Sequence, residues 1–574
     1  MLFSFFFGFI RKKEVEDSLP LSLLGMSASS SAPGSPAADD SSSSGTEERR
    51  KKRSRRKLKV QLENNGPPEI QPEELIMFEK IGGGCYGEVY RGECRGKEVA
   101  IKKLFKQDLK PENIAEFKKE VEICSRLHHP NVLLFMGACT KQNELSIVTE
   151  LMPKGNLEVL LRNKELPLPL RKRMLWAKDA ALGMNWLHKS SPPIIHRDLK
   201  PSNLLIDKHG TVKVCDFGLS AIKLTEKLQD KDSIPGTPLW MAPEVLTGRP
   251  LDEKCDVYSF GIVLWEIFTR EEPFPEFQSY REFKRAITLD NIRPPIPRDC
   301  PESLTSLMKR CWDPVPDRRP SFGEAIQLLD SVIIDATIPE DGNGNAFWKG
   351  QFLGKESVLW TPFAAVLAKF CNFPPPELSD PRWIALHAIL AQREEDSHAS
   401  PPPMVVTMER FGQVLSWFGP LEVRNSDADF TLLDRVLETL SQDWFHGDIE
   451  RIPCEAALKD KAPGTYIVRV STTVAGAFTI SKMASSRKIN HQRIDFKPGK
   501  GYKISVVSRN PPGSQTVSDN GTLKAFIEKI ATALHLNSPL TPNPYQAIIH
   551  PPEAALLQGY LVPDDDFGSS DSDD

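Results

Sequence analysis

One short stretch of the sequence gathers side chains suited to phosphoryl transfer. It reads His196-Arg197-Asp198-Leu199-Lys200-Pro201-Ser202-Asn203, and Asp216-Phe217-Gly218 follows it. Asp198 can orient an incoming hydroxyl group and accept its proton, and Lys200 can offset charge on the transferred phosphoryl group. Asn203 and Asp216 carry the hard oxygen atoms that magnesium selects. This pattern predicts transfer of a phosphoryl group from a nucleoside triphosphate to a hydroxyl group, assisted by one or two magnesium ions.

The spacing H-R-D-x-x-x-x-N followed by D-F-G resembles the signature of the protein kinase family. A second motif lies upstream, in Ile81-Gly82-Gly83-Gly84-Cys85-Tyr86-Gly87-Glu88-Val89. Its G-x-G-x-x-G pattern leads into an alternating strand and not into a helix, which excludes a Rossmann dinucleotide site. It favours a glycine-rich hairpin over the phosphates of ATP, where absent side chains let backbone N–H groups approach.

The kinase resemblance implies roles for further residues. Lys102 ends the apolar run Val99-Ala100-Ile101-Lys102 and is expected to grip the α- and β-phosphates. Its expected partner is Glu120, which fits the family's register where Glu116 and Glu122 do not. The remaining residues of the expected ATP site are Ala100, Thr149 behind the adenine, and the backbone at Glu150 and Met152.

The nature of the acceptor hydroxyl follows from the same resemblance. Lys200 marks serine/threonine chemistry, whereas the Cys311-Trp312 segment is similar to tyrosine kinases. The mixture resembles the tyrosine-kinase-like group, so serine/threonine transfer is expected, with tyrosine transfer allowed. Arg197 could receive a phosphate in the activation segment, and Thr237 is expected to contact Asp198 and Lys200. The phosphorylatable candidates in that segment are Ser220, Thr225 and Ser233, and Glu244 and Arg319 are the expected buried ion pair.

Composition bounds the remaining possibilities. A chain of 574 residues suggests several domains, and a net charge of -4 implies no wholesale nucleic-acid binding. Its 10 cysteines include no C-x-x-C pair or zinc-like cluster and are expected to be reduced thiols in a cytosolic or nuclear protein.

The N-terminal region is expected to lack a membrane span. The apolar run 1–10 is too short to cross a bilayer and precedes its positive charge, which argues against a secretory signal. A membrane-dipping anchor and an upstream extension before Met26 both remain open. The basic run 49–57 fits a nuclear signal, a patch for anionic lipid, or a solvated linker.

A less regular region precedes the second recognisable module. Apolar and aromatic residues recur at helical spacing in 360–370, 383–390 and 411–418, between proline-rich breaks. A small helical domain is expected, with no EF-hand calcium loop. In position and pattern it is similar to the helical linkers that precede SH2 domains in some signalling proteins.

The second module contains an arginine inside an apolar strand, Gly464-Thr465-Tyr466-Ile467-Val468-Arg469-Val470-Ser471. An unpaired buried charge is costly, so Arg469 needs an anionic partner. Together with Trp444-Phe445-His446-Gly447, this run resembles an SH2 domain. The resemblance implies that Arg469 forms the floor of a phosphotyrosine pocket, with Arg451, Ser471, His491 and Arg493 around it.

The expected architecture is a multidomain α+β chain. It comprises a disordered, basic, Ser-rich region (1–70), a bilobal protein-kinase domain (71–335), a helical linker region (336–440), an SH2 domain with a central antiparallel sheet flanked by two helices (441–540), and a disordered acidic tail (541–574). This order, with the SH2 domain after the kinase domain, resembles the Shk family of SH2-containing dual-specificity kinases.

That resemblance implies a cytoplasmic signalling kinase, recruited by phosphotyrosine partners to the plasma membrane. The expected cofactors are ATP and Mg²⁺, and the expected partners are protein substrates and phosphotyrosine proteins, with peripheral contact to anionic membrane left open and no specific nucleic acid. The alternative is a catalytically silent phosphotyrosine adaptor. Gly82, Lys102, Glu120, Asp198, Asn203 and Asp216 are all present, which favours the active enzyme.

Overall fold

The computed structural model describes most of the chain between Glu69 and Ile549. The described residues are 69–84, 87–104, 117–118, 121–122, 124–141, 144–216, 238–338, 341–377, 379–394, 399–426, 429–471, 473–497, 500–509 and 512–549. The chain divides into the units Met1–Gly66 and Pro67–Asp574, and all that follows concerns the second. The expectations for residues 1–68 and 550–574, and those for Cys85, Tyr86, Glu120, Ser220, Thr225, Ser233 and Thr237, lie outside the described residues.

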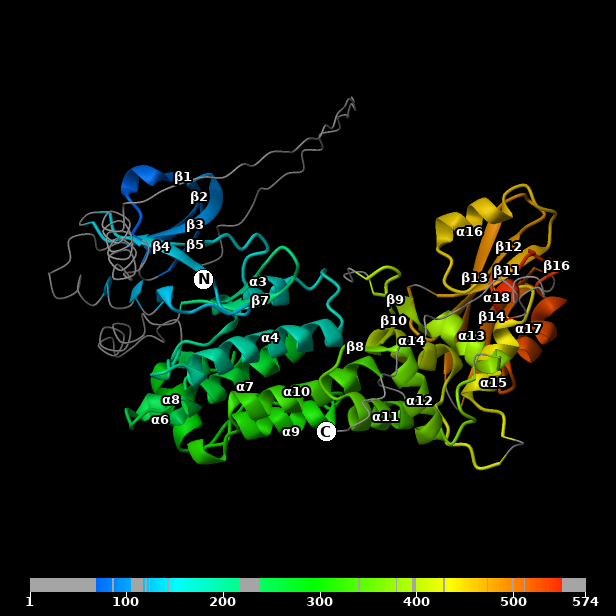
Figure 1. Cartoon of the computed structure of the whole chain (residues 1–574). Coiled ribbons are helices and arrows are strands. Elements are labelled where there is room, and N and C mark those ends of the chain that lie inside the picture. Colours follow the sequence, from blue (N-terminus) through cyan, green and yellow to red (C-terminus); the bar gives the residue numbers. More distant parts are fainter. Residues whose placement is uncertain are drawn as a thin grey trace, which may run out of the picture. The chain divides into compact units, whose positions relative to one another are not determined.

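The kinase domain opens with a five-stranded antiparallel sheet (Figure 1, blue to cyan). Its strands, in the order β1-β2-β3-β5-β4, are β1 (Leu75–Gly84), β2 (Gly87–Cys94), β3 (Lys97–Leu104), β4 (Phe135–Cys139) and β5 (Ser146–Glu150). Val99, Ile101 and Val148 are fully buried in this sheet. Because alternate residues of β3 point inward, Lys102 projects from the opposite face to Ile101.

The second lobe is mainly helical. It contains α3 (Leu157–Arg162), α4 (Leu170–Lys189), α6 (Pro243–Thr247), α7 (Lys254–Thr269), α8 (Tyr280–Thr288), α9 (Glu302–Cys311), α10 (Phe322–Thr337), the hairpin β6 (Leu204–Ile206) and β7 (Val212–Val214), and short 3₁₀ turns at Pro201–Asn203, Pro238–Trp240 and Pro316–Arg318. A further 3₁₀ turn, Pro72–Glu74, directly precedes β1. Residues Cys255 to Ile267 of helix α7 are all buried, so this helix forms the centre of the lobe. Helix α10 begins at a capping box between Ser321 and Glu324.

A helical region follows the kinase domain. It contains α11 (Gly342–Phe352), α12 (Trp360–Cys371), α13 (Pro381–Leu390), α14 (Met408–Phe418) and α15 (Leu432–Leu440). The helices expected at 360–370, 383–390 and 411–418 coincide with α12, α13 and α14. A small sheet in the order β8-β10-β9 was not anticipated, because its strands β8 (Ser357–Leu359), β9 (Gln392–Arg393) and β10 (Met404–Thr407) are too short to show an alternating pattern.

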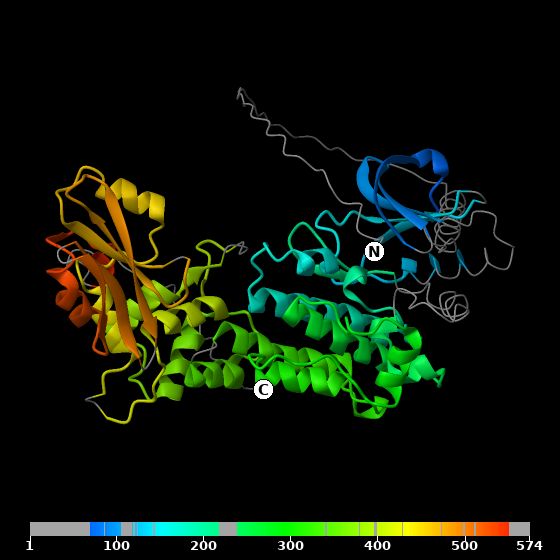
Figure 2. The ribbon, with the colours of Figure 1, turned by 180° about the vertical axis from the view of Figure 1, so that it is seen from behind.

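The SH2 domain has the expected antiparallel sheet. Its strands run in the order β15-β14-β13-β12-β11-β16 and are β11 (Thr465–Val470), β12 (Phe478–Met483), β13 (Ile489–Lys497), β14 (Gly501–Arg509), β15 (Pro512–Asp519) and β16 (Ser538–Pro539), the last of which pairs parallel with β11. Ile467 packs with Cys454 and Leu458 of α16 (Arg451–Leu458), while the next residue, Val468, belongs to the core on the other face. That core includes Phe526 of α17 (Leu523–Ala531). The two helices therefore cover opposite faces of the sheet (Figure 1 and Figure 2).

The folded part of the chain extends past both expected boundaries. At its start, Ile70 is 2% exposed and its N–H donates to the Ala138 carbonyl over 3.0 Å, so ordered contacts with the sheet begin before residue 71. At its end, the described structure continues past residue 540, where a disordered tail was expected. Buried Asn543 donates to the carbonyls of Leu440 and Gln442, and the short helix α18 (Gln546–Ile549) buries Ile549. These long-range bonds hold a segment whose proline content had suggested a tail.

Two further observations concern the described residues as a whole. The nine cysteines among them are all free thiols. No helix there combines the length and the apolar character that a membrane crossing requires.

Candidate active site and anion-binding pocket

The loop after α4 brings Asp198, Lys200 and Asn203 together. Asn203 Nδ2 donates to the Asp198 carbonyl over 2.6 Å and to Asp198 Oδ2 over 3.1 Å. Lys200 Nζ lies 3.4 Å from the same carboxylate oxygen. Asp198 is 9% exposed, so most of its surface is covered and its carboxylate is held by Asn203 and Lys200. The three residues that the sequence nominated thus meet at one carboxylate.

Asp256, in the first turn of α7, holds this loop through hydrogen bonds to its backbone. Its Oδ2 accepts from the His196 N–H over 2.8 Å and from His188 Nε2 over 2.8 Å, and its Oδ1 accepts from the Arg197 N–H over 2.7 Å. Arg197 has a φ of 61°, a left-handed backbone conformation that arginine rarely adopts without external support. The sequence analysis did not nominate Asp256 for any role at the site. The signal for its positioning role was an acidic residue at the start of a helix whose following residues are mostly apolar.

His196 links this loop to the segment that carries Asp216, the expected magnesium ligand. His196 is fully buried, and its Nε2 donates to the Cys215 carbonyl over 2.9 Å. Its Nδ1 accepts from the Asp198 N–H over 3.3 Å. Because Cys215 directly precedes Asp216, this one ring ties the backbone at Asp198 to the backbone at Asp216.

Asp216 meets the lysine of β3. The distance from Lys102 Nζ to Asp216 Oδ1 is 2.6 Å. Burial alone would lower the pKa of Lys102, but the Asp216 carboxylate outweighs it and raises that pKa above its usual value. Asp216 has a φ of 60°, so it too is held in a left-handed conformation. Lys102 and Asp216 therefore form one charged pair.

The glycines of the hairpin differ in whether the surrounding protein leaves room for a side chain at their positions. A Cβ on Gly87 would lie 2.2 Å from the Lys103 carbonyl oxygen, so the pairing of β2 with β3 itself requires a glycine at this position. A Cβ on Gly82 or Gly83 would meet its nearest neighbour at 3.8 Å or 3.5 Å, which is ordinary contact. Packing within the protein therefore does not explain the glycines at these two positions, whereas close approach by a ligand would.

The neighbouring residues of the expected nucleotide site are placed as follows. Ile81 is 47% exposed, and Glu88 pairs with Lys80 over 2.6 Å and accepts from the Tyr90 hydroxyl. The charge of Glu88 is thus neutralised within the sheet. Cross-strand pairs join Val89 to Lys102 and Ala100 to Thr149, and Gly84 is the last residue of β1.

The connection between the lobes follows β5. The Glu150 N–H donates to the Leu134 carbonyl over 3.1 Å, and the Glu150 carboxylate accepts from Lys213 Nζ over 2.8 Å. Met152 is 7% exposed and its carbonyl accepts from the Gly155 N–H. The side chain of Glu150 therefore joins this segment to the β6–β7 hairpin of the second lobe.

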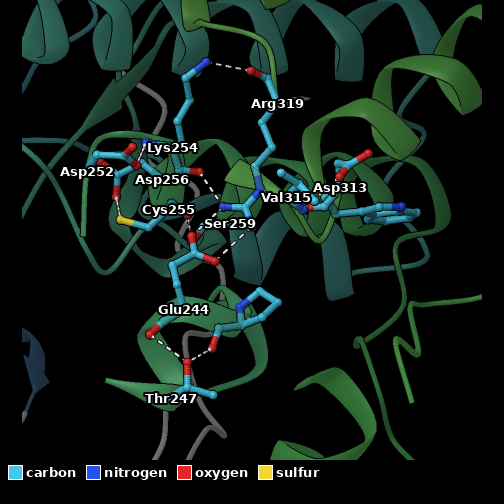
Figure 3. Close-up of polar contacts among 12 residues, drawn as sticks. Glu244, Thr247, Asp252, Lys254, Cys255, Asp256, Ser259, Asp313, Val315 and Arg319 are labelled. Atoms are coloured by element: carbon cyan, nitrogen blue, oxygen red, sulfur yellow. Dashed lines mark hydrogen bonds and ion pairs between the residues drawn. The ribbon is translucent and has the colours of Figure 1, made fainter. Parts of the chain in front are cut away.

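The expected structural ion pair is confirmed (Figure 3). Arg319 Nη1 and Nη2 lie 2.5 Å and 2.9 Å from the two carboxylate oxygens of Glu244, and both residues are buried. Arg319 Nε donates to the Asp313 carbonyl, and Lys254 Nζ donates to the Arg319 carbonyl. All three fork nitrogens of Arg319 have partners, so the pair is a fixed support and not a reactive group.

A second site lies on the α16 face of the SH2 sheet. Arg469 is 6% exposed, its Nε has no hydrogen-bond partner among the described residues, and its Nη1 makes one long contact of 3.5 Å with the Val470 carbonyl. Arg469 pairs across the sheet with Thr479, which pairs with Arg493, so the two arginines share a face. A buried guanidinium with unused donors on this face is suited to an anion.

The other residues expected in this pocket lie on β13, in the loop after β11 and on α16. Ser471 Oγ accepts from the Val474 N–H over 3.1 Å, which shapes the loop after β11. His491 lies on the Arg469 face, whereas Arg493 pairs with Asp495 over 2.8 Å. Arg451 starts α16 and is largely exposed. One residue was missed: Glu455 of α16 accepts from both Arg451 and His491.

The charged groups of the active site do not form a self-sufficient metal centre. Among the residues that the structure describes, no group of three or more His, Cys, Asp or Glu side chains could hold a metal ion. The donors at the active site are one carboxylate, Asp216, and one amide, Asn203. Magnesium sites of phosphoryl-transfer enzymes commonly use one or two protein ligands and complete their coordination with substrate phosphates and water.

Arg197 carries another unused donor. Its Nε is buried and has no hydrogen-bond partner among the described residues. The activation-segment residues that could carry a phosphate for it lie outside those residues.

Comparison with known proteins identifies both modules. The family model for protein tyrosine and serine/threonine kinases matches residues 75–329, and the SH2 domain model matches residues 444–511. Dual specificity protein kinase shkC of Dictyostelium discoideum is 46% identical over 477 residues, which cover 80% of this chain and 92% of that protein. Dual specificity protein kinase shkA of the same organism is 44% identical over 516 residues, covering 86% and 93%. The probable serine/threonine-protein kinase SIS8 of Arabidopsis thaliana is 46% identical over 274 residues, covering 47% and 26%.

Proposed function

Because the chain belongs to the Shk family of SH2-containing dual specificity protein kinases, we propose that it transfers the γ-phosphoryl group of ATP to serine and threonine hydroxyl groups, with tyrosine transfer also allowed. The observation that carries this proposal is the meeting of Lys200 and Asn203 at the Asp198 carboxylate, in a loop tied to the Lys102–Asp216 pair. A loop with only a structural role would not need this concentration of charged side chains.

In the proposed reaction, Asp198 orients the acceptor hydroxyl and accepts its proton. The carboxylate is suited to this because Asn203 fixes one of its oxygens and the loop backbone is held by Asp256. Lys200, beside the same oxygen, places positive charge where the transferred group gains negative charge. The protein's share of catalysis is thus positioning and electrostatic stabilisation.

The donor set fits ATP and magnesium. Asp216 and Asn203 would hold the cation, which neutralises phosphate charge when bound. Lys102 would bind the α- and β-phosphates, and the space before Gly82 and Gly83 supports close approach of phosphate to the backbone. Because Lys102 contacts Asp216 in this structure, nucleotide binding would exchange that contact for phosphate and cation.

We assign phosphotyrosine binding to the Arg469 pocket. Its support is the buried guanidinium with an unused Nε, on the sheet face that also carries His491 and Arg493. A phosphate dianion offers three oxygens and could accept from several of these donors at once. Such docking would raise the local concentration of substrates near the kinase domain and so recruit the enzyme to phosphotyrosine partners.

The purified full chain tests the kinase proposal. With ATP and magnesium, the wild type should phosphorylate itself and myelin basic protein, and phosphoamino acid analysis should find phosphoserine and phosphothreonine. Asp198→Asn should lower kcat by at least about 100-fold, because the proton acceptor is lost. Binding of a phosphotyrosine peptide should be unchanged in that variant, since the pocket is a separate site.

Two outcomes would contradict the proposal. Retained turnover by Asp198→Asn would remove Asp198 from the mechanism. A wild type as silent as the variant, with phosphopeptide binding intact, would favour the catalytically silent adaptor.

A further inference from the structure

One acidic side chain lies among the basic residues of the SH2 pocket. Glu455 stands one helical turn after Arg451 in α16. Its Oε1 accepts from Arg451 Nε over 2.7 Å and from His491 Nε2 over 3.0 Å. These two hydrogen bonds hold the pKa of Glu455 below its usual value, so the carboxylate is ionised near neutral pH.

The orientation of the His491 ring is fixed by a second hydrogen bond. His491 Nδ1 lies 2.8 Å from the Ser481 hydroxyl on the neighbouring strand, which fixes the ring. With Nδ1 engaged by Ser481, Nε2 is the nitrogen that faces α16, and it meets Glu455. On this face of the sheet, Arg469 therefore has an unused donor, whereas Arg451 and His491 already donate to a carboxylate.

Under the pocket assignment made above, a phosphate on Arg469 would draw on Arg451 and His491 as further donors. Arg451 and His491 cannot give their Nε and Nε2 hydrogens to the phosphate while Glu455 holds them. The carboxylate also carries the same sign of charge as the ligand, so leaving it in place adds repulsion. Glu455 is 38% exposed at its side chain and sits on a surface helix, so it can swing into solvent.

We propose that Glu455 is an internal competitor for the phosphotyrosine pocket, a carboxylate that occupies Arg451 and His491 until the ligand phosphate displaces it. This inference rests on the assignment of the Arg469 pocket to phosphotyrosine. It makes Glu455 an affinity-setting residue: the intrinsic strength of the pocket is partly offset by a partner that the chain supplies itself. The opposite role, in which Glu455 merely positions Arg451 and His491 for the ligand, predicts the opposite effect of removing its charge.

The test compares four full-length proteins: wild type, Glu455→Gln, Glu450→Gln and Arg469→Ala. Glutamine keeps the size of Glu455 and an acceptor oxygen but removes the charge. Glu450, exposed at the N-cap of α16, is the matched control because its replacement removes an equal charge one residue before Arg451. Binding is measured without ATP by fluorescence anisotropy, with a labelled pool of phosphotyrosine peptides carrying random flanking residues and the unphosphorylated pool as blank. Thermal unfolding confirms that each variant is folded.

Glu455→Gln should bind the phosphorylated pool about 3- to 10-fold more tightly than the wild type, since partly exposed charge pairs are each worth about 0.2–1 kcal/mol. Glu450→Gln should stay close to the wild type. Affinity that is unchanged or weaker in Glu455→Gln, while Arg469→Ala loses binding, would overturn the competitor role and leave the pocket assignment standing. Undiminished binding by Arg469→Ala would contradict the pocket assignment itself.

Discussion

The backbone N–H of Arg197 donates to Oδ1 of Asp256 over 2.7 Å, although 59 positions of sequence separate the two residues. Arg197 adopts a left-handed backbone conformation there, and the other carboxylate oxygen of Asp256 accepts from the His196 N–H. Asp256 is fully buried at the start of α7. One buried carboxylate thus supports the strained turn that presents Asp198.

We expect Asp256→Asn to impair both the loop and the fold. The amide replaces one acceptor by a donor, so at least one of the N–H groups at His196 and Arg197 is left unsatisfied, at a cost of about 1–3 kcal/mol. Since the loop geometry is disturbed and not the nucleotide site, kcat should fall more than KM for ATP rises. Steady-state kinetics and thermal unfolding check this. An unchanged kcat would show that the loop holds its conformation without Asp256.

The buried pair of Glu244 and Arg319 should be sensitive to loss of either partner. Glu244→Gln leaves the Arg319 guanidinium buried without its counter-charge, and we expect destabilisation of about 3–5 kcal/mol. The double variant Glu244→Gln/Arg319→Met removes both charges and should recover part of that loss. Urea unfolding of the wild type, each single variant and the double variant measures the coupling. Single variants as stable as the wild type would contradict a structural role.

Asp179 of α4 should make stability depend on pH. Burial raises the pKa of Asp179 to about 6, although its carboxylate accepts from the Val212 N–H over 3.0 Å. The folded chain therefore retains a proton between about pH 4 and 6 that the unfolded chain releases, so ionisation of Asp179 lowers the free energy of unfolding as pH rises through this window. The effect is on the order of 3 kcal/mol, since each pKa unit corresponds to about 1.4 kcal/mol.

The measurement compares the wild type with Asp179→Asn from pH 4 to pH 7. Relative to the variant, the wild type should lose stability as pH rises, because only its residue 179 ionises. A difference in unfolding free energy that stays constant across this range, or that grows in favour of the wild type, would show that the carboxylate is ionised throughout in the folded state.

The two modules and their candidate residues could be predicted because these residues lie in short, local sequence motifs. The spacing from Asp198 to Asn203 holds three functional groups within one turn of chain, so sequence distance nearly equals spatial distance. Arg469 was identifiable because a charge inside an apolar strand demands an anion. Local periodicity also predicted the helices near 360–370, 383–390 and 411–418, but it did not show the short strands β8, β9 and β10.

The sequence by itself thus determined the two modules and their order, and it nominated the candidate residues of both sites. Only the tertiary structure decided which distant groups meet. It pairs Lys102 with Asp216 across 114 positions, places Asp256 beneath the catalytic loop, and sets Glu455 against His491. It also extends the fold to Ile549 through the bonds of Asn543 to Leu440 and Gln442. Such contacts depend on how helices and strands pack, and the packing of surfaces far apart in sequence leaves no local periodicity to read.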